Sequence, residues 1–440
     1  MKKIFIYSLY IVNLAILTTC WWYFSGGVFF TGTLGDWLLS VGKLMGIIAT
    51  YQALTQLMLI GRVKWIEQLF GLDKLSRVHK WNGYAILGLV ILHIFLVTKG
   101  IGTLNNVAYA DQAMILLRYC EDIFKAFLAY FILLFTVVLS ITIVRRKLKY
   151  EWWYWVHLLN YLTFILFLGH QLHYGMSSES EAFRIYWLAL YAVAGGSILW
   201  FRFIAPLLKF YKHQFIIKEV KTENGGVATS ITITGKRIDE FKIKAGQFMI
   251  FRFLQRGFWY EAHPFSLSTE PNSTHIRITA KNLGDFTAKL PNLQPGTRVL
   301  IDGPHGVFTQ EKNITDKYLL IAGGIGITPI RSLAESLGKA GKDVVLLYSA
   351  KTKNDAVLLD ELQTLAQQYQ LKLIPILDGE QLPGFEFGRL DKAKLAELAP
   401  DLATRDVYLC GPPQMMNALK TSLTELGLPH KQLHWERFAL

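Results

Sequence analysis

The first 210 residues alternate between long apolar runs and short polar connections. Each run reaches the length of about 20 residues that an α-helix needs to cross a bilayer. The runs lie at about 4–24, 37–60, 80–98, 122–144, 155–174 and 184–205. This pattern predicts a six-span α-helical membrane domain over residues 1–210.

After residue 210 the pattern changes to short strands and turns. Between 214 and 308, runs such as VATSITITG and FMIFRFL are separated by Gly and Pro, which predicts an antiparallel β-barrel domain over 211–310. From 317 onward, short apolar strands alternate with helical segments such as IRSLAESLG. That order predicts an α/β domain with a parallel, doubly wound sheet over 311–440. We therefore expect a multidomain protein.

Charge orients the predicted membrane domain. The net charge is +13, and the basic clusters at 2–3, 62–64, 145–149 and 209–212 flank the apolar runs. By the positive-inside rule, both termini are expected in the cytoplasm and the spans in the inner (plasma) membrane. This account of the basic residues removes nucleic acid as an expected partner. The first run continues past residue 20 without a convincing cleavage site, so we expect it to be retained as a span.

Four histidines lie in two of the predicted spans, His79 and His93 in one and His157 and His170 in the other. Polar side chains inside a membrane usually have a function. At about 1.5 Å per residue, the 14 residues between His79 and His93 correspond to about 21 Å, which suits two stacked metal groups within a bilayer. Neutral imidazole is a good axial ligand for haem iron. Since both spans run outward, we expect His79 to pair with His157 near the cytoplasm and His93 with His170 near the outer face.

The 13-residue spacing between His157 and His170 is less regular. Thirteen residues leave an angular offset of about 140° on an ideal helix. Either this span contains a local distortion, or the two haems approach it from different directions around its axis. Gly169 is a candidate position for a bend. His173 is a rival outer ligand. Other metals or a proton relay usually involve carboxylates, and these two spans have none at depth.

Three cysteines, Cys20, Cys120 and Cys410, form no metal-type spacing. Cys20 and Cys120 both fall near the predicted outer face, where a disulfide between them is one alternative.

The barrel region carries residues suited to a flavin. The stretch 263–269, HPFSLST, offers an aromatic ring for stacking, several hydroxyls and a histidine for a phosphate. The later segment 281–287, KNLGDFT, places a glycine turn before a helix whose free amides suit a pyrophosphate. The turn DGPHG at 302–306 fits the end of such a domain.

The α/β region carries residues suited to a dinucleotide. The run AGGIGITP at 322–329 lies between a strand and a helix, where glycine lets the backbone approach a phosphate. The strand ending in CGPP at 410–413 would place Cys410 at the carboxyl edge of the sheet. Ser349, Lys351 and Lys353 follow another strand that lacks an acidic residue at its tip, which favours NADPH over NADH.

Together the histidine quartet, HPFSLST, GGIGITP and CGPP resemble the NADPH oxidase and ferric reductase superfamily over nearly the whole chain. The resemblance implies two b-type haems, FAD and NAD(P)H as cofactors. It implies that Phe265 stacks on the flavin and that Ser266 approaches its N5. His263 would lie near the pyrophosphate and Cys410 would face the nicotinamide. Members commonly end in an aromatic residue that covers the flavin; here that residue is Phe438, with two residues beyond it.

The remaining residues expected to contact the cofactors follow from the same motifs. In the flavin motifs they are Pro264, Ser268, Thr269, Lys281, Gly284 and Thr287. In the dinucleotide motifs they are Gly323, Gly324, Gly326, Thr328, Pro329, Gly411 and Pro412. Ser266, Cys410 and Phe438 are the residues expected to act closest to the reacting atoms.

The expected function is transmembrane electron transfer from cytosolic NADPH, through FAD and two haems, to an acceptor on the far side. Dioxygen, giving superoxide, is the first candidate acceptor because the outer loops are short. A ferric chelate is the alternative, and a quinone or a periplasmic protein stays open. No obligatory protein partner is evident. A membrane-anchored flavin reductase with structural histidines is a second class of function. A transporter or channel is disfavoured because the spans lack charged pathway residues.

Overall fold

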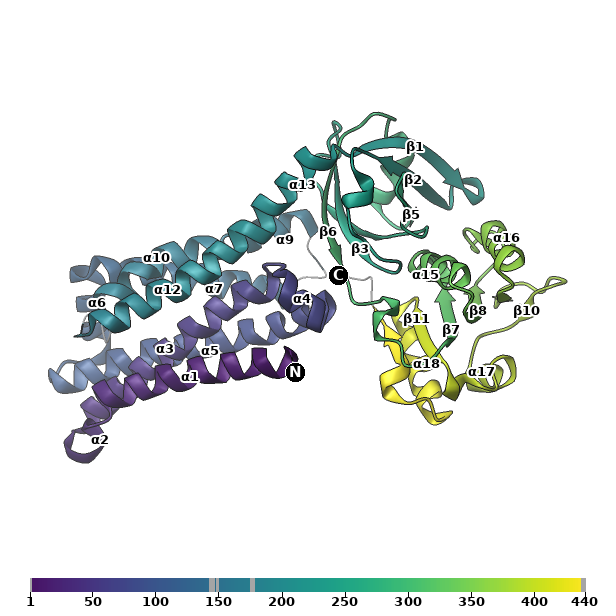
Figure 1. Ribbon diagram of the computed structural model, residues 1–440. Coiled ribbons are helices and arrows are strands. Elements are labelled where there is room, and N and C mark those ends of the chain that lie inside the picture. Colours follow the sequence, from purple (N-terminus) through teal and green to yellow (C-terminus); the bar gives the residue numbers. More distant parts are fainter. Residues whose placement is uncertain (1, 142–146, 148–149, 175–178, 437–440) are drawn as a thin grey trace. The chain divides into compact units, whose positions relative to one another are not determined.

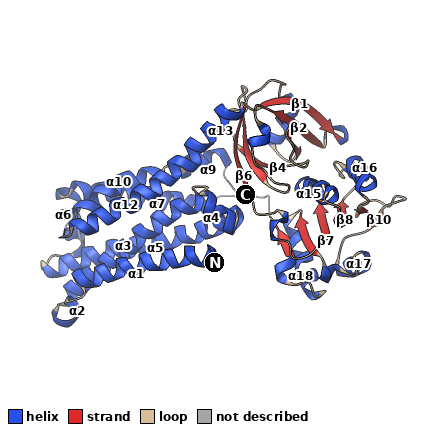
Figure 2. Ribbon diagram, viewed as in Figure 1, coloured by secondary structure: helices blue, strands red, loops and turns tan. Residues whose placement is uncertain are grey.

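The computed structural model describes residues 2–141, 147, 150–174 and 179–436. The chain forms two compact units (Figure 1). The amino-terminal unit comprises Met1–Leu69 and Lys74–Phe201, and the carboxy-terminal unit comprises Phe70–Asp73 and Arg202–Leu440. Figure 2 shows that helices build the first unit, whereas strands and helices build the second.

Long helices lie side by side in the amino-terminal unit (Figure 1). Its described helices are α1 (Lys2–Ser25), α2 (Val28–Thr31), α3 (Leu34–Ile60), α4 (Lys64–Phe70), α5 (Leu72–Leu104), α6 (Tyr109–Tyr119), α7 (Glu121–Ser140), α9 (Tyr150–His157), α10 (Asn160–His173) and α12 (Glu181–Ile198). A π-helical turn (Leu199–Ile204) joins α12 to α13 (Ala205–His213), and α13 belongs to the second unit.

Five described helices are long and apolar enough to cross a membrane. They are Lys2–Ser25, Leu34–Ile60, Leu72–Leu104, Glu121–Ser140 and Glu181–His213. The apolar run at 155–174 is divided between two helices, because α9 ends at His157 and α10 begins at Asn160. Between them, Leu159 N–H donates to the Val156 carbonyl three residues back, which tightens the backbone. The distortion expected from the 13-residue spacing is therefore present, but at 158–159.

Gly169 is not the site of that distortion. It lies inside α10, and a Cβ there would approach Asp122 Oδ1 of α7 to 2.5 Å. Gly169 thus permits close packing of α10 against α7. The predicted bend at Gly169 is wrong.

Small residues also bring α3 and α5 together. A Cβ on Gly42 would lie 2.9 Å from the Val97 amide nitrogen, and a Cβ on Gly100 would lie 2.7 Å from the Leu39 amide nitrogen. Such close backbone approach is typical of helix packing in membranes. It places the carbonyl groups of α3 within reach of side chains on α5.

Six strands form two three-stranded antiparallel sheets in the first part of the carboxy-terminal unit. They are β1 (Ile216–Glu223), β2 (Ala228–Thr234), β3 (Phe248–Phe253), β4 (His263–Ser266), β5 (Ile276–Lys281) and β6 (Val299–His305). The strand orders are β1-β2-β5 and β4-β3-β6, and isolated bridges at Ile216–Arg298 and Leu267–Ile278 link the two sheets. The short helix α14 (Asp285–Lys289) follows β5. The prediction of antiparallel strands in this region is confirmed.

A six-stranded parallel sheet forms the last part of the chain. Its strands are β7 (Lys317–Gly323), β8 (Asp343–Ala350), β9 (Lys372–Leu377), β10 (Glu386–Phe387), β11 (Asp406–Cys410) and β12 (Leu433–Trp435), in the order β10-β9-β8-β7-β11-β12. Helices α15 (Ile327–Lys339) and α16 (Leu359–Tyr369) share one apolar core with the sheet. Helices α17 (Lys392–Leu398) and α18 (Pro413–Glu425) share the other. The predicted parallel sheet with helices on both faces is confirmed.

Candidate functional site

The histidines form two pairs inside the helical bundle. The ring centres of His79 and His157 lie 6.0 Å apart, and those of His93 and His170 also lie 6.0 Å apart. Both pairs have the same interplanar angle of 62°. The structure thus brings together the two pairs expected from depth in the membrane, with α5 supplying one ring to each.

One ring nitrogen of His93, Nδ1, forms a hydrogen bond with a backbone carbonyl. His93 Nδ1 lies 2.8 Å from the Gly42 carbonyl, so Nδ1 carries the proton and donates it. The Nε2 lone pair is then available to a metal, which is the usual arrangement for ligating histidines. Gly46 leaves room for this ring, because a Cβ there would lie 2.7 Å from His93 Nδ1.

Of the other three rings, only that of His157 has a polar contact at Nδ1 among the described residues. His157 Nδ1 lies 3.3 Å from Ser140 Oγ, which also accepts a hydrogen bond from Trp153 Nε1, and the Trp153 ring stacks on His157. Nδ1 of His79 and of His170 are buried and have no hydrogen-bond partner among the described residues.

The paired rings fit haem iron. Two imidazoles that bind one metal from opposite sides, with bonds of about 2.0–2.1 Å, place their ring centres about 6 Å apart. Among the described residues there is no cluster of three or more His, Cys, Asp or Glu side chains that would hold a metal by itself. The spacing within each pair is consistent with two imidazoles that would hold the iron of a haem.

His173 lies apart from these pairs. Its exposed ring donates a hydrogen bond from Nδ1 to Asp122 Oδ2 at 2.8 Å, and the ring paired with His93 is that of His170. This geometry favours His170 over the rival. Cys20, Cys120 and Cys410 are all free, so the disulfide alternative is not realised.

In the antiparallel sheets, the HPFS residues form β4 beside β3, with Phe265 opposite Met249 and Pro264 opposite Ile250. The His263 ring stacks on Phe286 with centres 3.8 Å apart, and His263 Nε2 lies 3.0 Å from Glu261 Oε2. Phe265 is half-buried and lies 6.4 Å from Phe286. The motif thus forms an aromatic cluster in which Phe265 is only partly covered.

Ser266, Ser268 and Thr269 are buried. The Ser268 hydroxyl accepts hydrogen bonds from Arg277 Nε and from Thr279 Oγ1, and the Thr269 carbonyl accepts one from Ser332 of α15. These hydrogen bonds occupy the Ser268 hydroxyl and the Thr269 carbonyl within the protein, and the expected contacts of both side chains with a cofactor stay predictions.

Lys281 and Thr287 also have partners within the protein. Lys281 Nζ lies 2.7 Å from Asp355 Oδ1, and this ammonium group lowers the pKa of the Asp355 carboxyl. Thr287 Oγ1 accepts hydrogen bonds from the Leu283 and Gly284 amides and so caps the start of α14. A Cβ on Gly284 would meet no atom within 4 Å, which leaves the backbone there open.

The glycine-rich turn after β7 packs against the turn after β11. A Cβ on Gly326 would lie 2.5 Å from the Cys410 carbonyl oxygen, and a Cβ on Gly411 would lie 3.1 Å from Gly323 Cα. Gly324 has a φ of +51°, which favours glycine. The two motifs therefore meet backbone to backbone at the carboxyl edge of the sheet. This is where ligands bind in open α/β sheets.

The neighbouring motif residues lie at the same edge. Thr328 and Pro329 are buried in the first turn of α15, and Pro412 precedes α18, 2.9 Å from a Cβ built on Gly323. Ser349 pairs with Gly323 across β7 and β8, and Lys351 follows β8. The Lys353 amide donates to a carboxylate oxygen of Glu380.

Cys410 is 1% exposed, and burial raises the pKa of its thiol. A protonated thiol is a contact residue and not a nucleophile. Glu436 is buried nearby and was missed by the sequence reasoning, although it lies only two residues before Phe438. Phe438 itself lies outside the described residues.

A second missed feature is an ionic network that joins the two lobes of the carboxy-terminal unit. Both guanidinium nitrogens of Arg277 bind the Glu361 carboxylate, at 2.8 and 2.7 Å, and Arg331 Nε binds it at 2.9 Å. Burial works against the Glu361 charge, but the two arginines outweigh it and lower the Glu361 pKa. These residues are 84 and 30 positions from Glu361, so no local pattern indicates the network.

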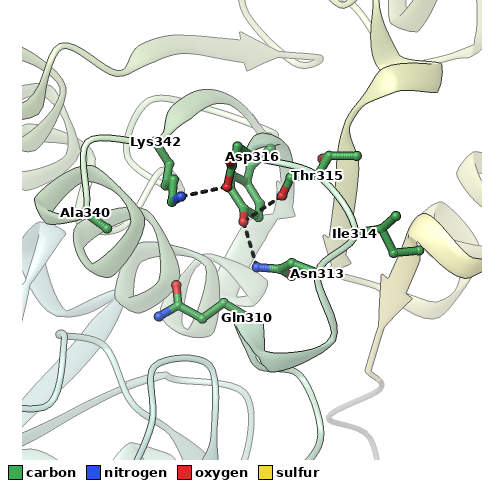
Figure 3. A pocket seen from close by; sticks show the side chains of 8 residues that line it. Gln310, Asn313, Ile314, Thr315, Asp316, Ala340 and Lys342 are labelled. Atoms are coloured by element: carbon green, nitrogen blue, oxygen red, sulfur yellow. Dashed lines mark hydrogen bonds and ion pairs between the residues drawn. The ribbon is translucent and has the colours of Figure 1, made fainter.

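The surface hollow in Figure 3 does not belong to the nucleotide site. It has a volume of about 370 Å³ and is lined by residues including Gln310, Thr315, Asp316 and Lys342. Asp316 and Lys342 form an ion pair of 2.6 Å just before β7 and β8 begin. They therefore mark the amino edge of the parallel sheet, opposite to the glycine-rich turns.

Three family matches follow one another along the chain. Residues 45–168 match a ferric reductase like transmembrane component, residues 214–309 an FAD-binding domain, and residues 320–421 an oxidoreductase NAD-binding domain. Together they are the domain architecture of the NADPH oxidase and ferric reductase superfamily. The chain thus carries the FAD- and NAD-binding domains of an oxidoreductase behind a transmembrane component.

Individual relatives match part of the chain. The ferredoxin reductase component of 3-ketosteroid-9-alpha-monooxygenase from Mycolicibacterium smegmatis is 30% identical over 205 residues, which are 46% of this chain and 57% of that protein. NADH oxidoreductase HCR of Escherichia coli is 29% identical over 195 residues, 43% of this chain and 58% of that protein. The chain therefore spans little more than half the length of these curated relatives.

Solved structures also match part of the chain. The flavohem-like FAD/NAD-binding domain of nitric oxide dioxygenase from Vibrio cholerae O1 biovar El Tor aligns with a TM-score of 0.46 and 24% identity. The alignment covers 51% of this chain and 98% of that one.

Proposed function

We propose that the chain transfers electrons from cytosolic NADPH, through FAD and two b-type haems, to an acceptor on the far side of the inner membrane. The proposal rests on the two imidazole pairs, which have the same distance of 6.0 Å between their ring centres. One helix, α5, holds a member of each pair 14 residues apart, which corresponds to about 21 Å along its axis. Two groups at this separation span most of a hydrocarbon core about 30 Å thick.

His79 and His157 would hold the inner haem, and His93 and His170 the outer one. When bound, the nicotinamide supplies a hydride, the flavin divides it into single electrons, and the haems carry those electrons across the membrane. The protein's part is to fix the ligands. The Gly42 carbonyl holds the His93 tautomer, and Gly46 leaves space for the ring.

The carboxy-terminal unit would hold the two nucleotides. Half-buried Phe265 would stack on the flavin ring, with Ser266 next to it in β4 and His263 near the phosphates. Gly324 leaves the backbone at the start of α15 open to a pyrophosphate, because a Cβ there would meet no atom within 4 Å. Gly323 and Gly326 instead let this turn pack closely against Met415, Pro412 and Cys410.

The same edge would receive the nicotinamide and the ribose 2′-phosphate. The Cys410 thiol, which burial keeps protonated, contacts the nicotinamide. Ser349 and Lys351 follow β8, where a 2′-phosphate would lie, and they support NADPH over NADH.

Dioxygen, reduced to superoxide, is the proposed acceptor because it needs only an accessible haem edge. A ferric chelate is the second candidate, favoured by the match of residues 45–168 to a ferric reductase like transmembrane component. The purified protein should be reduced by NADPH without oxygen and then mixed separately with oxygen or ferric citrate. Faster haem reoxidation by oxygen supports the first acceptor, and faster reoxidation by ferric citrate replaces it with the second.

The route itself is tested by His93→Leu, with His173→Leu as the matched control. We expect His93→Leu to abolish reduction of the far-side acceptor while NADPH still reduces the flavin, because only the outer pair is lost. His173→Leu should keep both activities, since His173 bonds to Asp122 outside the pairs. Full cross-membrane activity in His93→Leu contradicts the proposed route and favours a membrane-anchored flavin reductase.

A further inference from the structure

A second hollow lies in the carboxy-terminal unit directly after α13. It has a volume of about 490 Å³, within the range of about 300–1,000 Å³ usual for small-ligand sites. It is lined by Gln214, Ile216, Thr234, Gly235, Lys236 and Arg298. No carboxylate is among these lining residues.

Hydrogen bonds and close packing fix the backbone around this hollow. The Lys236 amide donates to the His213 carbonyl at the end of α13, and buried His213 Nδ1 lies 3.0 Å from the Arg237 carbonyl. A Cβ on Gly235 would lie 2.5 Å from the His213 carbonyl oxygen, so the β2 end and the α13 end are in direct contact. Contacts between the end of β2 and the end of α13 thus fix the shape of the hollow.

Its two cations differ from their neighbours. Lys212 pairs with Glu240 at 2.6 Å, whereas Lys236 and Arg298 form no ion pair with any described residue. The Arg298 guanidinium instead lies 4.5 Å from the centre of the Phe210 ring, which holds its side chain against α13. Two cations without counterions in a hollow free of carboxylates suit a phosphate ester.

The preceding helix points to the source of that phosphate. Leu207, Leu208 and Tyr211 of α13 are exposed, and α13 is the last part of the candidate spanning helix Glu181–His213. Gln214, the first lining residue, directly follows this helix. Exposed apolar side chains on α13, followed by the cations Lys236 and Arg298 without an ion-pair partner among the described residues, match the boundary between the acyl chains and the headgroups of a bilayer.

We propose that this hollow binds the phosphate headgroup of an anionic phospholipid. Lys236 and Arg298 contact the phosphate oxygens, Gln214 contacts the glycerol hydroxyls, and the acyl chains lie along Leu207, Leu208 and Tyr211. The site is separate from the histidine pairs and the glycine-rich turns, and its occupancy does not depend on the proposed electron acceptor.

The test uses the full chain in nanodiscs of phosphatidylcholine that contain phosphatidylglycerol, with retained lipid counted by native mass spectrometry. Lys236→Gln/Arg298→Gln should weaken phosphatidylglycerol retention about 30-fold, since each cation near an anionic surface contributes a factor of about five. The matched control Lys289→Gln/Lys431→Gln removes the same charge from exposed positions elsewhere and should retain lipid as the wild type does. Equal losses in both double variants would overturn the proposal.

Two further arms keep the result specific. Lys236→Arg/Arg298→Lys keeps both charges and should restore retention; failure to do so in a protein with unchanged circular dichroism overturns the site. Glycerol 3-phosphate is added to the protein in pure phosphatidylcholine nanodiscs to distinguish a free phosphate ester from a lipid. Binding as tight as that of phosphatidylglycerol would replace the lipid by a soluble ligand and so contradict the proposal.

Discussion

Replacing Gly46 by alanine should disturb the outer histidine pair and leave the inner pair intact. The new Cβ would lie 2.7 Å from His93 Nδ1 and 2.8 Å from Cε1, about 0.7 Å short of the 3.4 Å of ordinary contact. The ring cannot retreat without stretching its 2.8 Å hydrogen bond to the Gly42 carbonyl. Gly46→Ala is therefore a test of the outer site that leaves all four histidines in place.

The size of the effect follows from these contacts. Overpacking of a tight site costs about 1–3 kcal/mol, and loss of one hydrogen bond adds about 0.5–1.5 kcal/mol. Disturbing a partner that orients a metal ligand usually weakens metal binding about 10–100-fold. We expect an effect of this order on the outer haem alone, because Gly46 contacts neither His79 nor His157.

The assay is haem content per chain together with a redox titration of the purified variant. Gly46→Ala should retain one haem firmly and lose or shift the other, whereas the wild type keeps two. Gly88→Ala is the matched control, since a Cβ at Gly88 of α5 meets no atom within 4 Å. Two haems with unchanged potentials in Gly46→Ala would refute the reasoning about the outer pair.

Three further predictions concern the carboxy-terminal unit. Lys281 lowers the pKa of Asp355, so the ion pair stabilises the folded protein above about pH 3.9, and this stabilisation is lost as the pH falls through the lowered pKa. The difference in unfolding free energy between wild type and Asp355→Asn should therefore shrink below that pH. A difference that grows on acidification would be evidence against the pair. Burial raises the pKa of the Cys410 thiol, so iodoacetamide should modify Cys410 only after unfolding, as mass spectrometry can show; rapid labelling of the native protein would count against its buried position. Gly326→Ala places a Cβ 2.5 Å from the Cys410 carbonyl oxygen and should lower the free energy of unfolding by about 1–3 kcal/mol, measured with denaturant. It should also raise the KM for NADPH, measured from initial rates. Unchanged values of both would show that the two turns do not need this contact.

The fold was predictable where local pattern decides it. Apolar length indicated the long helices, and the change to short alternating runs indicated the antiparallel and parallel sheets. The 13-residue interval between His157 and His170 correctly indicated a distorted helix. Its position was not predictable, because Gly169 has a packing role against Asp122 that depends on tertiary structure.

The site was predictable where neighbouring residues define it. The glycine-rich turn and CGPP could be recognised because each follows a strand directly. The partners of Lys281 and Ser268 could not, since Asp355 lies 74 residues from Lys281 and Arg277 reaches Ser268 from another strand. Sequence alone assigned both side chains to a cofactor, whereas in the structure Lys281 pairs with Asp355 of the other lobe and Ser268 binds Arg277 and Thr279 of β5.

On the proposed route, the two imidazole pairs each hold a b-type haem that NADPH can reduce. The most direct measurement is the reduced-minus-oxidised absorption spectrum of the purified full chain after anaerobic addition of NADPH, with haem and flavin counted per chain. Two haems per chain, both reduced by NADPH, are predicted. Flavin bands without haem bands would contradict the claim and assign the histidines a structural role.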